Sequence, residues 1–162
     1  MTQRVGLGFD VHRFAAPEDG RPLKLMGVTV PFDRGLAGHS DADVMLHALI
    51  DALLGAAGLG DIGLHFPDTD AAYQGADSVV LLERTMHELM SRGWRVENAD
   101  VCLIGERPKI GPHRQAMQRR IAPLLGIGFE ALNVKATTTE QLGFTGRGEG
   151  LAAQAVVLIE MA

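Results

Sequence analysis

Two short tracts near the start of the chain constrain the fold most, because each places metal-ligand side chains on a different kind of element. The first tract, Gly8 to His12, lies in an extended apolar segment, where side chains alternate so that Asp10 and His12 point to the same side. The second tract, His39 to His47, leads into a run with helical periodicity that contains His47. A fold in which these side chains act together must bring one strand against one helix.

One carboxylate and two imidazoles suit zinc or another borderline divalent ion. Three protein ligands leave a fourth coordination position open, which is typical of catalytic rather than structural sites. The tripeptide from Asp10 to His12 also arises by chance, and a core helix with a polar edge of Asp43, His47 and Asp51 explains most of the second tract. The tracts further along the chain favour the metal interpretation.

The acidic charge balance limits the partners that the chain can bind. A formal net charge of −5 argues against nucleic acid, because phosphate backbones are bound through clustered Lys and Arg. An acidic protein that binds phosphates must use metal ions, backbone amides or helix N-termini. We expect one domain over residues 1–162, and the lack of a leader or a long apolar run predicts a cytoplasmic protein with no membrane partner.

Hydrophobic periodicity and glycine breaks predict an alternation of strands and helices. We expect strands over residues 5–14, 23–26, 28–32, 95–107, 132–136 and 151–159, and helices over 41–57, 77–92 and from 112 to a stop at 126. Ser40 is the expected N-cap of the first helix, with Asp43 as its reciprocal partner.

These elements predict an α/β protein of the α+β type, with a single mixed sheet of four to five strands and helices on one face. The other face must then bury its apolar side chains by self-association. The alternating side chains expected to supply part of that surface are Ala153, Ala155, Val157 and Ile159.

Two polar tracts near the end of the chain carry further candidate chemistry. The tract from Thr137 to Glu140 directly follows a strand, so its hydroxyls and free amides could cradle a phosphate while Glu140 holds a hard cation such as magnesium. An exposed Thr-rich turn is the alternative. In the next tract, four glycines surround Arg147 and Glu149, which indicates a charge pair held inside a binding or assembly site.

Together these tracts resemble one protein family, the 2-C-methyl-D-erythritol 2,4-cyclodiphosphate synthases of the non-mevalonate isoprenoid pathway. The resemblance spans residues 5–158 and matches the stand-alone form. It rests on the order and spacing of GFDVHRF, HSDADVMLHALIDALLGAAGLGDIG, FPDTD, NVKATTTE and LGFTGRGEG.

The resemblance implies a role for each matching residue. It implies that Asp10, His12 and His47 bind zinc or manganese, that Glu140 binds magnesium, and that His39 and Thr138 are catalytic. It also places five of these residues at the substrate, namely Asp10, His12, His39, Thr138 and Glu140. The other residues that it places there are Ser40, Asp61, Gly63, Phe66, Asp68, Asp70, Pro108, Lys109, Thr137, Thr139, Phe144 and Arg147. Arg107 and Gly111 depart from the pattern expected around the cytidine.

The implied assembly is a homotrimer with active sites between subunits and a central cavity that takes an isoprenoid diphosphate. The implied reaction converts 4-diphosphocytidyl-2-C-methyl-D-erythritol 2-phosphate to the cyclic diphosphate and releases CMP. Two alternatives stay open at this point. One is a phosphohydrolase that uses the same metal to activate water. The other is a non-catalytic trimer that only binds isoprenoid diphosphates.

Overall fold

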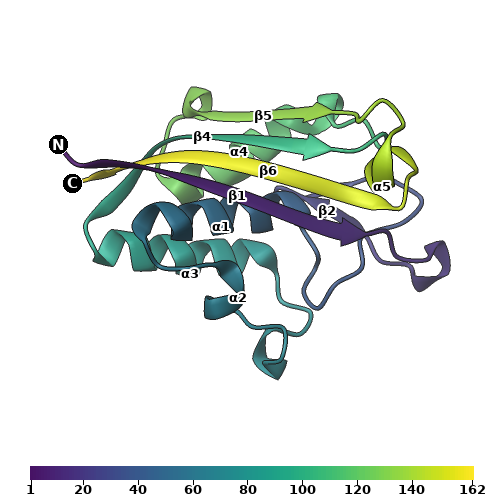
Figure 1. Cartoon of the computed structure of the whole chain (residues 1–162), viewed down its shortest axis with the longest axis horizontal. Helices are drawn as coiled ribbons and strands as arrows, with labels where there is room; N and C mark the ends of the chain where they lie inside the picture. The colour runs from purple at the N-terminus through teal and green to yellow at the C-terminus, as the bar shows by residue number, and fades with distance from the viewer.

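The computed structural model describes residues 1–162, in which a four-stranded sheet covers a layer of helices (Figure 1). The strands of the sheet run in the order β1-β6-β4-β5. Only β4 and β5 are parallel, so the sheet is mixed as expected. Its strands are β1 (Gln3–Arg13), β4 (Trp94–Ile104), β5 (Leu132–Thr137) and β6 (Gly150–Met161).

Two short strands form a separate hairpin rather than extending the main sheet. They are β2 (Leu23–Leu25) and β3 (Val28–Val30), joined by a turn at Met26 and Gly27 in which both residues have positive φ. The expectation that this segment is strand is confirmed, and the main sheet has four strands.

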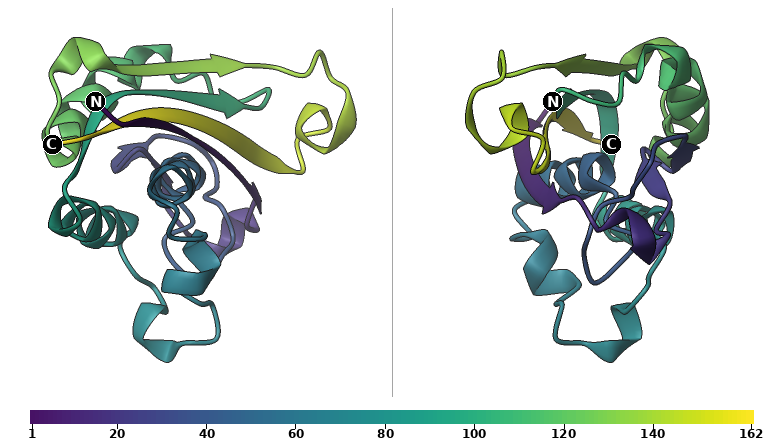
Figure 2. Two further views of the ribbon diagram at one scale, coloured as in Figure 1. Left: turned by 60° about the vertical axis from the view of Figure 1, so that its left-hand side comes forward. Right: turned by 90° about the vertical axis from the view of Figure 1, so that its right-hand side faces the viewer.

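The three long helices lie on one face of the sheet, and their apolar sides join the core (Figure 2). The three long helices are α1 (Val44–Ala57), α3 (Ser78–Ser91) and α4 (Arg114–Leu125), and the two single turns are α2 (Ile62–His65) and α5 (Gly143–Gly146). None of these helices is long and apolar enough to cross a membrane.

Helix α1 is the centre of the core and is buried almost all round. His47, Asp51 and Gly55 are the only residues of the helix that are not buried. The expected polar edge at His47 and Asp51 is therefore confirmed. The N-cap is Asp43 rather than Ser40, because the buried Asp43 carboxylate accepts hydrogen bonds from Leu46 N and also from Met26 N and Gly27 N in the hairpin turn.

The exposed face of the sheet differs from the expectation. Ala153, Ala155, Val157 and Ile159 are buried against the helices, so the prediction that they form the open face was wrong. Strand β6 is apolar on both sides, and its small residues Ala153 and Ala155 lie on the side that α1 approaches. The open face instead carries a row of exposed apolar side chains, namely Val5, Leu7, Phe9 and Val11 of β1 and Val156 of β6.

Candidate metal centre and substrate cavity

Two glycines allow α1 to lie directly on β1, and this close approach brings the candidate metal ligands together. A Cβ atom added at Gly8 would lie 1.8 Å from the carbonyl oxygen of Ala48, and one at Gly6 would lie 1.9 Å from that of Ala52. No larger residue fits at either position. Asp10 and His12 follow these glycines on β1, and they face His47, which precedes Ala48 on α1.

Asp10, His12 and His47 point their ligand atoms at one another. The Oδ2 atom of Asp10 lies 2.9 Å from Nε2 of His12 and 3.3 Å from Nδ1 of His47. The two ring nitrogens lie 3.2 Å apart. Ligands at zinc-like bond lengths of about 2.0–2.1 Å in a tetrahedron are separated by about 3.3 Å. The three side chains therefore fit a single divalent cation.

The hydrogen bonding of the cluster supports the same interpretation. Oδ2 of Asp10 is buried but receives no hydrogen bond of good geometry, although two ring nitrogens lie beside it. The other nitrogen of His12, Nδ1, donates to the carbonyl oxygen of Ala37 at 2.9 Å, which leaves Nε2 directed at the cluster. Metal-bound histidines are usually oriented by such a bond on the second nitrogen.

The charges of the cluster are coupled. Burial alone would raise the pKa of Asp10, but its contacts with His12 and His47 outweigh burial and lower this pKa to about 2. Burial would lower the pKa of His12, but the Asp10 carboxylate outweighs it and raises that pKa. Asp10 and His12 therefore each stabilise the charged form of the other. A divalent cation can take the place of the His12 proton, because a metal-bound imidazole nitrogen must be deprotonated.

A cavity of about 440 Å³ opens beside the three ligands. Its walls include several of the residues that the sequence predicted for the substrate, namely Asp10, His12, His39, Ser40, Gly63, Phe66 and Asp68, together with the metal ligand His47. Sequence reasoning missed Tyr73, which also lines the cavity. Tyr73 packs edge-on against Phe66. It is the only tyrosine in the chain, and this was the one sequence feature that could have pointed to it.

Two of the predicted substrate residues, Asp61 and Asp70, are not among the lining residues but adjoin Ile62 and Thr69, which are. The Asp61 carboxylate caps α2 by accepting a hydrogen bond from Leu64 N, and Asp70 caps a short turn by accepting one from Ala72 N. The carbonyl oxygen of Asp70 lies 3.2 Å from Nε2 of His39. Both aspartates therefore hold the segment that forms one wall.

The predicted cytidine residues and the Thr-rich tract lie outside this cavity. Pro108 and Lys109 follow β4, and the segment Thr137–Glu140 begins at the last residue of the parallel strand β5, so both lie at the same end of the sheet. The Glu106 carboxylate joins them by accepting hydrogen bonds from Thr139 N and Gln141 N, each at 3.1 Å. Residues 140 and 141 have left-handed backbone conformations with φ of 54° and 64°.

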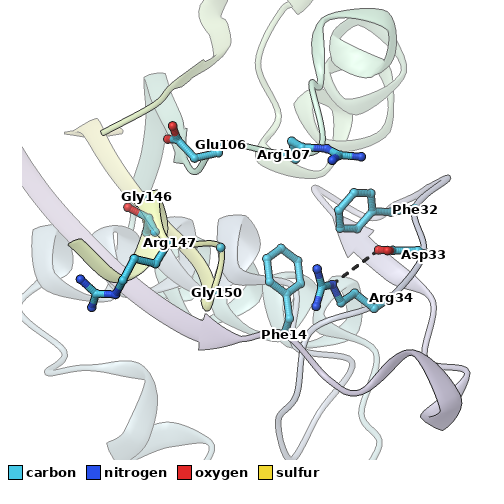
Figure 3. A pocket seen from close by; sticks show the side chains of 11 residues that line it. Phe14, Phe32, Asp33, Arg34, Glu106, Arg107, Gly146, Arg147 and Gly150 are labelled. Atoms are coloured by element: carbon cyan, nitrogen blue, oxygen red, sulfur yellow. Dashed lines mark ion pairs between the residues drawn. The ribbon is translucent and has the colours of Figure 1, made fainter. Parts of the chain in front are cut away.

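A second cavity, of about 260 Å³, lies between the end of β1 and the glycine-rich turn that contains α5 (Figure 3). Arg147 lies at its edge and points away from Phe14 and Phe32. Arg147 pairs with Glu149 at 2.8 Å, but both side chains are more than half exposed, at 64% and 58%. The expectation that this charge pair is held inside is wrong for the single chain.

The fold and the site define an α/β protein in which three side chains that fit a divalent cation lie beside a polar cavity. Residues 3–160 match the model of the YgbB family, and the chain belongs to this family. A relative named 2-C-methyl-D-erythritol 2,4-cyclodiphosphate synthase, from Desulfatibacillum aliphaticivorans, is 59% identical over 157 residues, which cover 97% of this chain and 99% of the relative.

Two solved structures share this fold. The bifunctional IspDF of Campylobacter jejuni matches with a TM-score of 0.93 and 45% identity. The match includes 99% of this chain and 43% of the longer IspDF chain. A 2C-methyl-D-erythritol-2,4-cyclodiphosphate synthase in a form bound to CDP has a TM-score of 0.87 and 41% identity, with 97% of this chain covering all of that chain. The expected family resemblance is confirmed.

Proposed function

We propose that this chain catalyses the ring closure for which its relatives are named, converting 4-diphosphocytidyl-2-C-methyl-D-erythritol 2-phosphate to 2-C-methyl-D-erythritol 2,4-cyclodiphosphate with release of CMP. The observation that carries the proposal is the convergence of Asp10, His12 and His47 on one point at the wall of a cavity. Membership of the YgbB family supports it.

The reaction is an intramolecular phosphoryl transfer. An oxygen of the 2-phosphate forms a bond to the β-phosphorus, and the bond between that phosphorus and the oxygen bridging to the α-phosphate breaks, so that CMP leaves with the electron pair. No side-chain nucleophile is needed. Catalysis requires that the attacking phosphate be held in line and that negative charge be neutralised.

The metal ligands and the loops near them have separate roles in this proposal. Asp10, His12 and His47 hold zinc or manganese, and the carboxylate of Glu140 holds magnesium. Bound divalent cations neutralise phosphate charge and polarise phosphoryl oxygens. His39 and Ser40, on the cavity wall, position the diphosphate, and His39 and Thr138 stabilise charge that develops during the transfer.

The substrate is proposed to lie between two groups of residues. Asp61, Gly63, Phe66, Asp68 and Asp70 hold the methylerythritol part beside the metal ligands. The cytidine diphosphate part is held by Pro108, Lys109 and the run from Thr137 to Thr139. These groups do not share a cavity within one chain, so the proposal requires that a neighbouring copy supply the second group.

We therefore propose a homotrimer built on the open face of the sheet, with its active sites between subunits. The apolar row on β1 supports this assembly, because Val5, Leu7 and Phe9 are 67%, 66% and 52% exposed, and side chains of this kind are rarely left in water as a contiguous row. Phe144 and Arg147 would then face the threefold axis, where an isoprenoid diphosphate could bind. Each subunit would be a single catalytic domain in the cytoplasm.

One assay tests the proposed reaction against its alternatives. Purified protein is incubated with the cytidine substrate, with and without a chelator, and the products are separated by chromatography. We expect CMP and the cyclic diphosphate in equal amounts, both lost in chelator and restored by added zinc and magnesium. A linear phosphorylated product would indicate a hydrolase, and no turnover in the presence of metal would contradict the enzymatic proposal.

A further inference from the structure

The side of the His47 ring that faces away from the metal centre carries a hydrogen-bond network that the proposed reaction leaves unexplained. Nδ1 of His47 faces Asp10, whereas Nε2 lies 2.9 Å from Oγ of Ser78 and 3.2 Å from Oγ of Ser40. Ser78 is the first residue of α3 and is fully buried. A buried hydroxyl must have partners for its donor and its acceptor sites.

The partners of Ser78 determine which way the hydrogen bonds run. Its hydroxyl donates to Oδ1 of Asp41, and its backbone N–H donates to Oδ2 of the same carboxylate at 3.1 Å. Because an ionised carboxylate only accepts, the hydroxyl proton of Ser78 is committed to Asp41. The Ser78 oxygen must then accept from Nε2–H of His47. This tautomer leaves the Nδ1 lone pair of His47 free and directed at Asp10 and His12.

Asp41 is itself held firmly in place. Its backbone N–H donates to the carbonyl oxygen of Ala76 at 3.0 Å, and its Oδ1 accepts from Asp43 N at 3.2 Å. The carboxylate also lies at the start of α3, where free amides and the helix dipole favour negative charge. The segment that precedes α1 and the start of α3 are thus joined through Asp41.

We propose that Ser78 and Asp41 are positioning residues for His47, and this inference rests on the proposed metal centre. The relay from Asp41 through Ser78 fixes the orientation and tautomer of the imidazole and strengthens it as a donor toward a divalent cation. Partners of this kind behind a metal-bound histidine change metal affinity by about 10- to 100-fold.

The first test is the zinc affinity of Ser78→Ala, measured by competition with a chromophoric chelator. We expect zinc to bind about 10- to 100-fold more weakly than in the parent protein. The visible absorption bands of the cobalt-loaded variant should also shift, because the ring of His47 is no longer held. Ser78→Thr restores the hydroxyl and should recover most of the affinity.

Thr85→Ala is the matched control, because Thr85 is also a buried hydroxyl on α3 but bonds only to the carbonyl oxygen of Leu81. Its zinc affinity should stay within about twofold of the parent. Asp41→Asn provides a second arm that does not depend on the folding of Ser78→Ala, and it should also weaken zinc binding.

The outcomes separate the two claims. If the zinc affinity of Ser78→Ala is within twofold of that of the parent protein, the positioning role is wrong while the metal centre stands. If Ser78→Ala does not fold, the same result for Asp41→Asn leads to the same conclusion. If the parent protein itself binds no zinc or manganese, the metal centre is wrong and the positioning role is wrong with it.

Discussion

Gly8 of β1 lies so close to Ala48 of α1 that a single added methyl group would come within 1.8 Å of the Ala48 carbonyl oxygen. This contact sets the distance between the strand that carries Asp10 and His12 and the helix that carries His47. The proposed metal centre therefore depends on a glycine that offers no ligand.

Gly8→Ala should consequently destabilise the protein and disturb the metal centre together. We expect the free energy of unfolding in urea to fall by about 3 kcal/mol, because overpacking a rigid backbone contact forces the helix away from the strand. Zinc affinity should fall as well. Gly55→Ala is the control, because a Cβ at Gly55 meets nothing within 4 Å. That change on α1 should stabilise by about 0.5–1 kcal/mol.

The open face of the sheet gives a test of the proposed assembly. Leu7→Glu places a charge in the apolar row of β1 and should convert the trimer into monomers. Sedimentation equilibrium should then show the mass fall from three times 17.3 kDa to that of one chain. Met90→Glu is a matched change, because Met90 on α3 is also 66% exposed but lies in the helical layer. A parent protein that sediments as a monomer would refute the trimer.

The buried Asp43 carboxylate predicts a pH dependence of stability. Burial raises its pKa from 3.8 to about 6, despite hydrogen bonds from the amides of Gly27, Leu46 and Met26. The folded state therefore holds this proton more tightly than the unfolded state. Stability should fall as pH rises between about 4 and 6, by an order-of-magnitude estimate of about 3 kcal/mol.

Asp43→Asn removes this titration and isolates the effect. Urea unfolding of both proteins in chelator, from pH 4.5 to 7.5, should show the variant less stable throughout, because the amide cannot accept all three backbone hydrogen bonds. Its deficit should shrink as pH rises. A deficit that is constant across this range would show that Asp43 has no raised pKa.

Glu106 should matter for substrate binding more than for metal binding at the Asp10 centre. Glu106→Ala removes the carboxylate that accepts from Thr139 N and Gln141 N, and hydrogen bonds to charged groups contribute about 1.5–3 kcal/mol. We expect KM for the cytidine substrate to rise roughly tenfold or more, with zinc affinity unchanged. Glu97→Ala, which breaks an exposed ion pair with Arg95 on the same strand, should leave KM unchanged.

The sequence predicted the elements that carry the ligands, because alternation along β1 and helical periodicity along α1 are local signals. It did not predict the Asp43 cap, since two of the three amides bound by that carboxylate belong to a hairpin turn 16 and 17 residues earlier in the chain. The contact between Asp41 and Ser78 spans 37 residues and was missed for the same reason.

The orientation of β6 could not be read from its sequence either. Residues 151–159 are apolar on both sides except at Gln154, so alternation does not distinguish the core side from the open side. The approach of α1 to Gly8, which pairs with Ala155, decides which side is buried. Only the packed structure contains that information.

The most direct test of the account is the amount of divalent metal bound per chain, measured by elemental analysis after dialysis against zinc. We predict one tightly bound zinc ion at the Asp10 centre of the parent protein and none in a folded His47→Ala variant, which should also release no CMP from the cytidine substrate. A His47→Ala protein that keeps both the ion and the activity would contradict the central claim.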